Sequence, residues 1–171
     1  MHEGAGSITV RRAERSEATT LARLHEGHAL FRRYALETTA LAESLAQALD
    51  AGDRAVTAVR SGDPIGFAWW SPRGAFSRSP YLRLLVVAAQ AAGTGAGTAL
   101  MEAVEREAFA QAADLFLLVT RDNAGARRFY ERRGFEAVGE LHGYVAPGVD
   151  EVVMRKRRLP SAPPPITTPP A

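Results

Sequence analysis

Three alternating glycines lie between an apolar segment and a segment with helical patterning near the middle of the chain. Gly93, Gly95 and Gly97 follow the Leu- and Val-rich run 81–87 and precede a predicted helix over 98–113. Glycine permits positive φ angles and lets another group approach the backbone closely. The first N–H groups of a helix lack partners within it, and the helix dipole is positive there. Such a loop is suited to bind a phosphate, although a tight turn would also need one or two glycines.

The segments on either side of this loop predict how it is positioned. A short apolar run bounded by turn residues predicts a buried strand over 81–87, and a second such run spans 115–120. Strand, loop, helix and strand in this order form a βαβ unit, whose two strands are parallel and joined by a right-handed crossover.

Two common nucleotide-binding motifs match this loop poorly. The Walker motif needs a lysine followed by serine or threonine, and the loop contains no lysine. The dinucleotide motif needs a third glycine where Thr98 stands, and it belongs near the first strand of a doubly wound sheet. The sequence therefore disfavours ATP and NAD as ligands.

Two motifs of the chain resemble those of the GNAT superfamily, the acyl-CoA-dependent N-acyltransferases. Leu84-Leu-Val-Val87 followed by Gly93-Thr-Gly-Ala-Gly-Thr-Ala-Leu100 is similar to the family's pyrophosphate-binding motif. Asn123-Ala-Gly-Ala126, Phe129-Tyr-Glu131 and Gly134-Phe135 resemble its N-x-x-A-x-x-F-Y-x-x-x-G-F segment. Two motifs in the family's order and spacing are more specific than either alone. The resemblance covers about residues 8–158 and is strongest over 81–135.

The resemblance implies that acetyl-CoA is the cofactor and that backbone N–H groups of the glycine loop hold its pyrophosphate. The family pattern Q/R-x-x-G-x-G/A fits in two frames, which place either Ala92 or Gln90 at the Q/R position. The predicted helix register favours the frame with Ala92. The implied cofactor-binding residues are Leu85, Val86, Val87, Ala92, Gly93, Thr94, Gly95, Ala96, Gly97, Thr98, Asn123, Ala126, Phe129 and Tyr130.

Tyr130 is the candidate general acid. A tyrosine hydroxyl has a reference pKa near 10, so it stays protonated at neutral pH and can donate a proton to a departing thiolate. Its position matches that of the family's usual acid, although a structural tyrosine on an amphipathic helix would give the same pattern. Asn123 is expected to cap this helix, and the resemblance implies that it also contacts the pantetheine arm. An N–H group of Val86 or Val87, if unpaired in the sheet, is expected to stabilise the acyl carbonyl oxygen.

The general base is harder to identify from the sequence. A substrate amine is mostly protonated at neutral pH, so a group must accept its proton unless the amine binds already deprotonated. Glu26, His28 and Glu37 lie on or after the first predicted helix, near the expected acceptor site. His28 falls on an apolar stripe, which favours a structural role, and we therefore select Glu37. The acceptor pocket is expected to lie among the loop 34–39, one of two adjacent tryptophans, and the segment 142–150.

Composition limits the other possible functions. The chain has 171 residues, of which 46% are apolar, enough for one domain with a sizeable core. The lack of cysteine excludes disulfides, thiolate metal sites and a cysteine nucleophile, and we predict no metal. A net charge of only +2 argues against nucleic-acid binding. With no apolar run of about 20 residues and no leader pattern, we predict no membrane partner and a cytoplasmic protein, as monomer or homodimer.

The predicted order of elements matches an α/β (α+β) fold of the GNAT type, a mixed sheet with one splayed parallel strand pair and flanking helices. The expected helices span 17–34 with Ser16 as N-cap, 38 or 39 to about 52, 98–113 and 123–133. The expected strands span 8–12, 54–60, 65–70, 81–87, 115–120, 135–140 and 151–157, with loops at 71–80 and 141–150. We expect a flexible N-terminus at 1–7, the domain at 8–158, and a disordered tail at 159–171, where six of thirteen residues are proline.

The leading hypothesis is an N-acetyltransferase that moves an acetyl group from acetyl-CoA to a primary amine of a small molecule or protein by direct attack. A non-catalytic acyl-CoA sensor of the same fold is the main alternative. A nucleotide-binding regulatory domain is a third, which the motif mismatches disfavour.

Overall fold

The protein folds around a seven-stranded mixed sheet, seen in a computed structural model that describes residues 6–158. The strands follow the order β1-β2-β3-β4-β5-β7-β6, and in the described part of the chain only β4 and β5 pair in parallel. This confirms the predicted mixed sheet with one parallel pair. The strands are β1 (Thr9–Arg12), β2 (Arg54–Arg60), β3 (Asp63–Ala75), β4 (Ser79–Val87), β5 (Asp114–Thr120), β6 (Glu136–Ala146) and β7 (Val149–Arg157).

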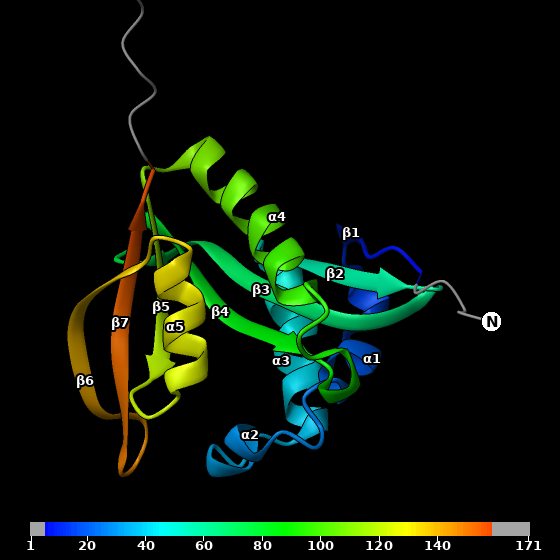
Figure 1. Ribbon diagram of the computed structural model, residues 1–171, viewed down its shortest axis with the longest axis horizontal. Helices are drawn as coiled ribbons and strands as arrows, with labels where there is room; N and C mark the ends of the chain where they lie inside the picture. The colour runs from blue at the N-terminus through cyan, green and yellow to red at the C-terminus, as the bar shows by residue number, and fades with distance from the viewer. Residues whose placement is uncertain (1–5, 159–171) are drawn as a thin grey trace, which may run out of the picture.

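Helices cover both faces of this sheet (Figure 1). The α-helices are α1 (Ala18–Arg23), α2 (Ala29–Arg33), α3 (Thr38–Asp50), α4 (Ala96–Gln111) and α5 (Ala124–Arg132). Leu21 of α1 and Leu45 of α3 are fully buried against one face. Leu100 and Val104 of α4 are fully buried against the other, where Tyr130 of α5 joins the same core cluster. The alternation of side chains along the strands supplies an apolar surface to each layer.

The two parallel strands separate after a short contact. Their pairing is limited to Tyr81 with Phe116 and Leu82 with Leu117. Beyond this point β4 continues beside β3 to Val87, and β5 continues beside β7 to Thr120. Figure 1 shows the two arrows diverging toward their C-terminal ends. The sheet therefore opens at its centre, as the family resemblance led us to expect.

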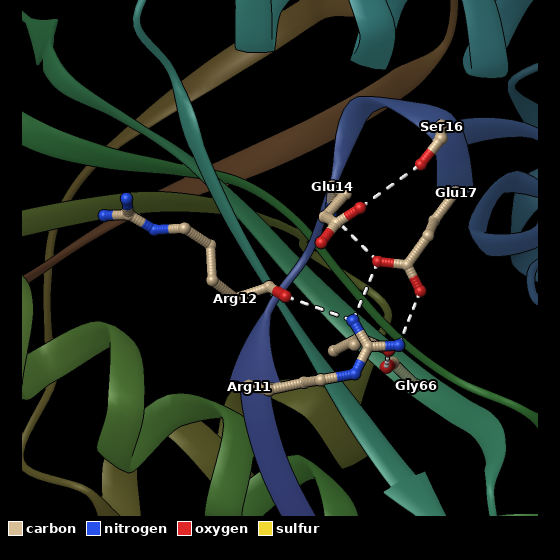
Figure 2. Close-up of polar contacts among 7 residues, drawn as sticks. Arg11, Arg12, Glu14, Ser16, Glu17 and Gly66 are labelled. Atoms are coloured by element: carbon tan, nitrogen blue, oxygen red, sulfur yellow. Dashed lines mark hydrogen bonds and ion pairs between the residues drawn. The ribbon is translucent and has the colours of Figure 1, made fainter.

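The predicted single helix over 17–34 is wrong. The structure has a 3-10 turn at Arg15–Glu17, then α1, a turn at 24–28 and the short α2. Gly27 has a φ of +86°, a left-handed conformation that ends a helix. Ser16 is not the N-cap residue, because the 3-10 turn begins at Arg15 and is capped by Glu14. Figure 2 shows the bonds that fix this turn: Glu17 accepts a hydrogen bond from the Glu14 N–H at 2.9 Å and two from Arg11 at 2.8 and 2.6 Å.

Two predicted loops are strands in the structure. β3 extends to Ala75 and β4 begins at Ser79, so the segment 71–80 is a hairpin with a register irregularity between Ser71 and Ala75. This irregular stretch accommodates Pro72, because a proline is tolerated where the hydrogen-bond ladder is already broken. The segment 141–150 is likewise a hairpin between β6 and β7, in which Ala146 pairs with Val149.

The helix termini differ from expectation in two places. Glu37, rather than Thr38 or Thr39, is the N-cap residue of α3, and α4 begins at Ala96, two residues before its predicted start. Asn123 is the N-cap of α5, as predicted. The expectations for 1–5 and 159–171 fall outside the described residues. No helix within 6–158 is long and apolar enough to cross a membrane.

Candidate active site

A cavity of about 340 Å3 lies where β4 and β5 diverge. Residues from both sides of the sheet and from the β6–β7 hairpin form its walls. Among them are Tyr34, Leu36, Trp69, Tyr81, Leu85, Thr120, Asn123, Ala126, Tyr130, Val145 and Glu151. The loop 34–39, one of the two tryptophans and the segment 142–150, which were expected to surround the acceptor, all contribute residues to the walls of this cavity. Trp70 packs in the core instead, at 1% exposure.

The structure brings only part of the predicted site to the cavity wall. Leu85, Asn123, Ala126 and Tyr130 line the cavity. Val86 is buried in the core between β4 and the α1–α3 layer. The glycine loop 92–98 lies beyond the end of β4, outside the lining. It still adjoins α5, because a Cβ added at Gly97 would lie 3.7 Å from Cζ of Phe129 and 3.6 Å from Cγ2 of Val87.

The glycine loop has the backbone conformation that its sequence predicts. Gly93 and Gly95 have φ angles of +74° and +90°, and an added Cβ at either would meet open space. Gly95 is the N-cap residue of α4, and the first intrahelical bond runs from the Ala99 N–H to the Gly95 carbonyl at 3.0 Å. The N–H groups of residues 96–98 precede this bond, so the helix itself gives them no partner. Ala96 is buried, Gly97 is half-buried and Thr98 is exposed. A helix start at Ala96 agrees with the frame that uses Gly95 and Gly97.

Tyr130 lies on the buried face of α5 and packs edge-on against Phe129 and Phe135, with ring centroids 5.2 and 5.6 Å away. Its side chain is 8% exposed, yet it still lines the cavity. Burial raises the pKa of Tyr130 above its usual value. The hydroxyl therefore remains protonated across the neutral range, which is the state that a general acid requires.

Asn123 has two functions in the local structure. Its Oδ1 accepts a hydrogen bond from the Ala126 N–H at 3.1 Å, which confirms the predicted N-cap. Asn123 also lines the cavity. Because Oδ1 is already engaged by the helix, the amide NH2 is the group that Asn123 can offer to a ligand.

The edge of β4 carries free backbone donors toward the opening. The Ala88 N–H donates to the Ile65 carbonyl at 2.9 Å, so it faces β3. The N–H groups of successive residues in a strand point to opposite edges, so the Val86 N–H faces β3 as well. The N–H groups of Leu85 and Val87 face the gap left by β5. Of the two valines considered in the sequence, only Val87 therefore directs its N–H to the gap, and Leu85 does so as well.

The structure does not bring Glu37 to the cavity. Glu37 is exposed at the start of α3 and is absent from the cavity lining. Glu26 accepts a hydrogen bond from the Thr38 hydroxyl at 2.9 Å, away from the same lining. His28 packs edge-on against Phe31 at 5.8 Å between ring centroids. None of the three carboxylate or imidazole groups considered for the base faces the cavity.

Sequence analysis missed Glu151, the carboxylate that does line it. Glu151 is 3% exposed and stands opposite Thr120 in the pairing of β5 with β7. The Tyr34 hydroxyl donates to its Oε1 at 2.5 Å and also contacts the Thr120 hydroxyl. Burial raises the pKa of Glu151, and burial followed by the bond to Glu151 raises the pKa of Tyr34 to about 12. The sequence of β7 gave no signal for this residue, because an acidic side chain in a strand usually faces solvent.

Charges around the cavity are otherwise paired. The Trp69 Nε1 donates to Asp53 Oδ2 at 2.8 Å, and the same carboxylate oxygen binds Arg83 at 3.0 Å. Asp53 thereby fixes the tryptophan wall and neutralises the arginine. Within residues 6–158, no group of three or more His, Cys, Asp or Glu side chains is arranged to hold a metal ion.

Comparisons with known proteins agree with this architecture. The family model of the acetyltransferase (GNAT) family matches residues 21–135. A GNAT-family protein structure from Desulfovibrio desulfuricans aligns at 25% identity and a TM-score of 0.73, over 88% of this chain and 99% of that one. The sequence matches none of the curated proteins.

Two further solved structures share the fold. The ribosomal-protein-alanine N-acetyltransferase of Brucella melitensis aligns at 22% identity and a TM-score of 0.70, over 88% of this chain and 99% of that one. The yncA protein of Salmonella typhimurium, solved with its cofactor acetyl-CoA, aligns at 16% identity and a TM-score of 0.72 over 92% and 97%.

Proposed function

Because the chain belongs to the GNAT acetyltransferase family, we propose that it transfers an acetyl group from acetyl-CoA to a primary amine. The observation that carries this proposal is the cavity between the diverging strands β4 and β5, which is lined by Tyr130 and Asn123. A buried, protonated hydroxyl beside a strand edge with free N–H groups is the chemistry that cleavage of a thioester needs.

The residues present fit the cofactor. The open space around Gly93 and Gly95 lets a pyrophosphate approach the backbone, and the start of α4 offers N–H groups and a positive dipole. The gap between β4 and β5 gives a pantetheine arm unpaired strand edges to bond with. The yncA structure with acetyl-CoA, which has the same fold, supports this choice of cofactor.

When bound, acetyl-CoA supplies an activated acyl group. In this proposal the N–H of Leu85 or Val87 donates to the acyl oxygen, where negative charge develops during attack. Tyr130 donates its hydroxyl proton to the departing sulfur, and the amide of Asn123 orients the arm. The apolar packing around the Tyr130 ring fixes the side chain and limits the access of water to it.

Two measurements test the proposal. Isothermal titration with acetyl-CoA, coenzyme A, NAD and ATP should give binding only for the first two. Thiol release from acetyl-CoA should then depend on an added amine in a panel of small amines and peptides. Binding of NAD or ATP in place of acetyl-CoA would overturn the cofactor assignment. Acetyl-CoA binding without release for any amine would instead favour a non-catalytic acyl-CoA sensor.

A further inference from the structure

Glu151 is a buried carboxylate without a cation of its own. Among the described residues, Arg33 is the cation that acts on it, and both oxygens of Asp122 already bind that guanidinium at 3.0 and 2.8 Å. A buried charge is costly unless something compensates it. The hydroxyl of Tyr34 supplies one hydrogen bond, and a carboxylate can accept several more.

We propose that Glu151 binds the ammonium form of the acceptor and takes its proton, and that the acceptor carries this amine on a small apolar body. The inference rests on the proposed acetyl transfer and specifies its substrate class. A cationic amine supplies the charge and the hydrogen-bond donors that Glu151 lacks. Burial places the pKa of Glu151 closer to neutral pH than that of a free carboxyl, which makes the carboxylate a better base.

The apolar body is argued from the walls around this carboxylate. Leu30, Phe31, Leu36, Leu41, Trp69 and Leu84 line the cavity. The one arginine in the lining, Arg83, is neutralised by Asp53 at 3.0 Å. A second cationic or anionic group on the acceptor would therefore be desolvated without a partner. At about 340 Å3 the cavity is near the lower limit for a small-molecule site, so the enclosed part of the acceptor must be small.

The proton balance is as follows. The ammonium gives one proton to the Glu151 carboxylate, and the freed nitrogen attacks the thioester carbonyl carbon. The C–N bond forms, the C–S bond breaks, and the sulfur takes the proton of the Tyr130 hydroxyl. The nitrogen loses its second proton, which restores Tyr130 through solvent, and Glu151 releases its own proton to water. The sum is amide, free thiol and one proton.

Tyr34 and Thr120 are positioning residues for this carboxylate. Thr120 lies opposite Glu151 on the neighbouring strand, so both side chains share one face of the sheet. Tyr34 follows α2 and joins them, and the adjacent Arg33–Asp122 pair fixes α2 to the segment after β5. The bond from Tyr34 and the charge of Arg33 lower the pKa of Glu151, against the effect of burial and the negative charges of Asp122 and Asp150. Tyr81 also lines the cavity, and its pKa is raised mainly by burial and in part by Glu151.

The test compares Glu151→Gln with wild type, using 2-phenylethylamine and a peptide amide with N-terminal leucine as apolar amines and ethanolamine as a polar one. The two apolar probes separate a small-molecule source from a protein N-terminus. We expect kcat/KM for the preferred apolar amine to exceed that for ethanolamine by at least about tenfold. In the Glu151→Gln variant, kcat/KM for the preferred amine should fall about 100-fold and the acid limb of the pH profile should disappear. The acetyl-CoA affinity should be unchanged. Glu140→Gln, an exposed carboxylate on the adjacent β6, should retain wild-type rates.

Tyr34→Phe gives a second readout that does not depend on the folding of the first variant. Removing the donor should raise the pKa of Glu151 and move the acid limb to higher pH, whereas a purely structural tyrosine would leave the limb in place. Three results would each overturn the inference while acetyl transfer stands. They are wild-type rates and pH profile in Glu151→Gln, an unshifted acid limb in Tyr34→Phe, and equal kcat/KM for ethanolamine and the apolar amines. Absence of transfer to every amine would overturn the proposed function first.

Discussion

The proposed cofactor side and the proposed acceptor side of the site are built by different means. On the cofactor side, which runs from the glycine loop to the free edge of β4, the groups offered are mostly backbone: the N–H groups at the start of α4, the conformation of Gly93 and Gly95, and the unpaired part of β4. On the acceptor side they are side chains, with Glu151 bonded to a tyrosine that lies 117 positions earlier in the chain. The backbone side depends on one contiguous βαβ unit, whereas the acceptor side depends on how distant segments pack.

This difference predicts how each of the two sides responds to substitution. A backbone site tolerates side-chain replacement as long as the required φ angles remain, so one short pattern can preserve it. A side-chain site changes with each substitution in any of the segments that form it. The cofactor side should therefore respond to conformational variants, and the acceptor side to chemical ones.

The largest expected effect is that of Tyr130→Phe, which changes chemistry alone. The ring and its contacts with Phe129 and Phe135 are retained, and only the hydroxyl is lost. We expect the single-turnover rate to fall about 100-fold, the low end for general acid catalysis, because a thiolate is itself a fair leaving group. Acetyl-CoA affinity should stay within about twofold.

The measurement uses two thioesters whose thiols differ in pKa, with the same amine. The loss should be smaller for the more acidic thiol, because that leaving group needs less help. Equal rates in both proteins would assign Tyr130 to packing and leave protonation to water.

Sequence patterns predicted the fold and the local conformation of the glycine loop well, but they did not identify the carboxylate that lines the cavity. The βαβ order, the single parallel pair and the Asn123 cap each follow from residues close together in the chain. The helix break at Gly27 and the β6–β7 hairpin could not be predicted in this way. A glycine or proline can end a helix or strand, but it can also lie in the turn of a longer hairpin, and the sequence alone does not distinguish the two. Glu151 was missed because its burial and its hydrogen bond to Tyr34 arise only when distant segments pack together.

The next effect is that of Gly95→Val on cofactor affinity. At a φ of +90° a β-branched residue is strained, and its side chain would occupy the open space that a phosphate needs. We expect the Kd for acetyl-CoA, measured by titration calorimetry, to rise at least about tenfold, which is about 1.4 kcal/mol.

Gly52→Val is the matched control for this strain. Gly52 also has a positive φ, +102°, and open space around an added Cβ, but it lies after α3, away from the glycine loop. Both variants should lose stability, and only the Gly95 variant should lose affinity. Equal affinity losses would show that strain, rather than blocked approach, weakens binding.

Asn123 belongs to both sides of the comparison, and two substitutions separate its functions. Serine is also a favoured N-cap residue, so Asn123→Ser should keep the cap while removing the amide that faces the cavity. Asn123→Ala removes both and should cost about 1 kcal/mol of folding free energy, or ~2–4 °C in Tm. Equal Tm losses in the two variants would show that the cap of α5 contributes little.

The smallest expected effect is a gain in stability from Glu151→Gln, which would show that the acceptor side is maintained at a cost to the fold. The pKa of Glu151 is raised by burial in the folded protein, so the folded state binds its proton more tightly than the unfolded state. The wild-type protein therefore loses stability relative to the variant as pH rises from the unfolded value, roughly 4.3, through the raised folded value. We expect the variant to be more stable at pH 7.5, by no more than about 1 kcal/mol or ~2–4 °C in Tm, and the difference to vanish near pH 4.

Asp150→Asn tests the sign of this stability change, because a bond to His142 lowers the pKa of this neighbouring carboxyl. That variant should melt lower than wild type at pH 7.5, with the difference shrinking as pH falls; the same sign in both variants would contradict the assignment of the cost to the burial of Glu151.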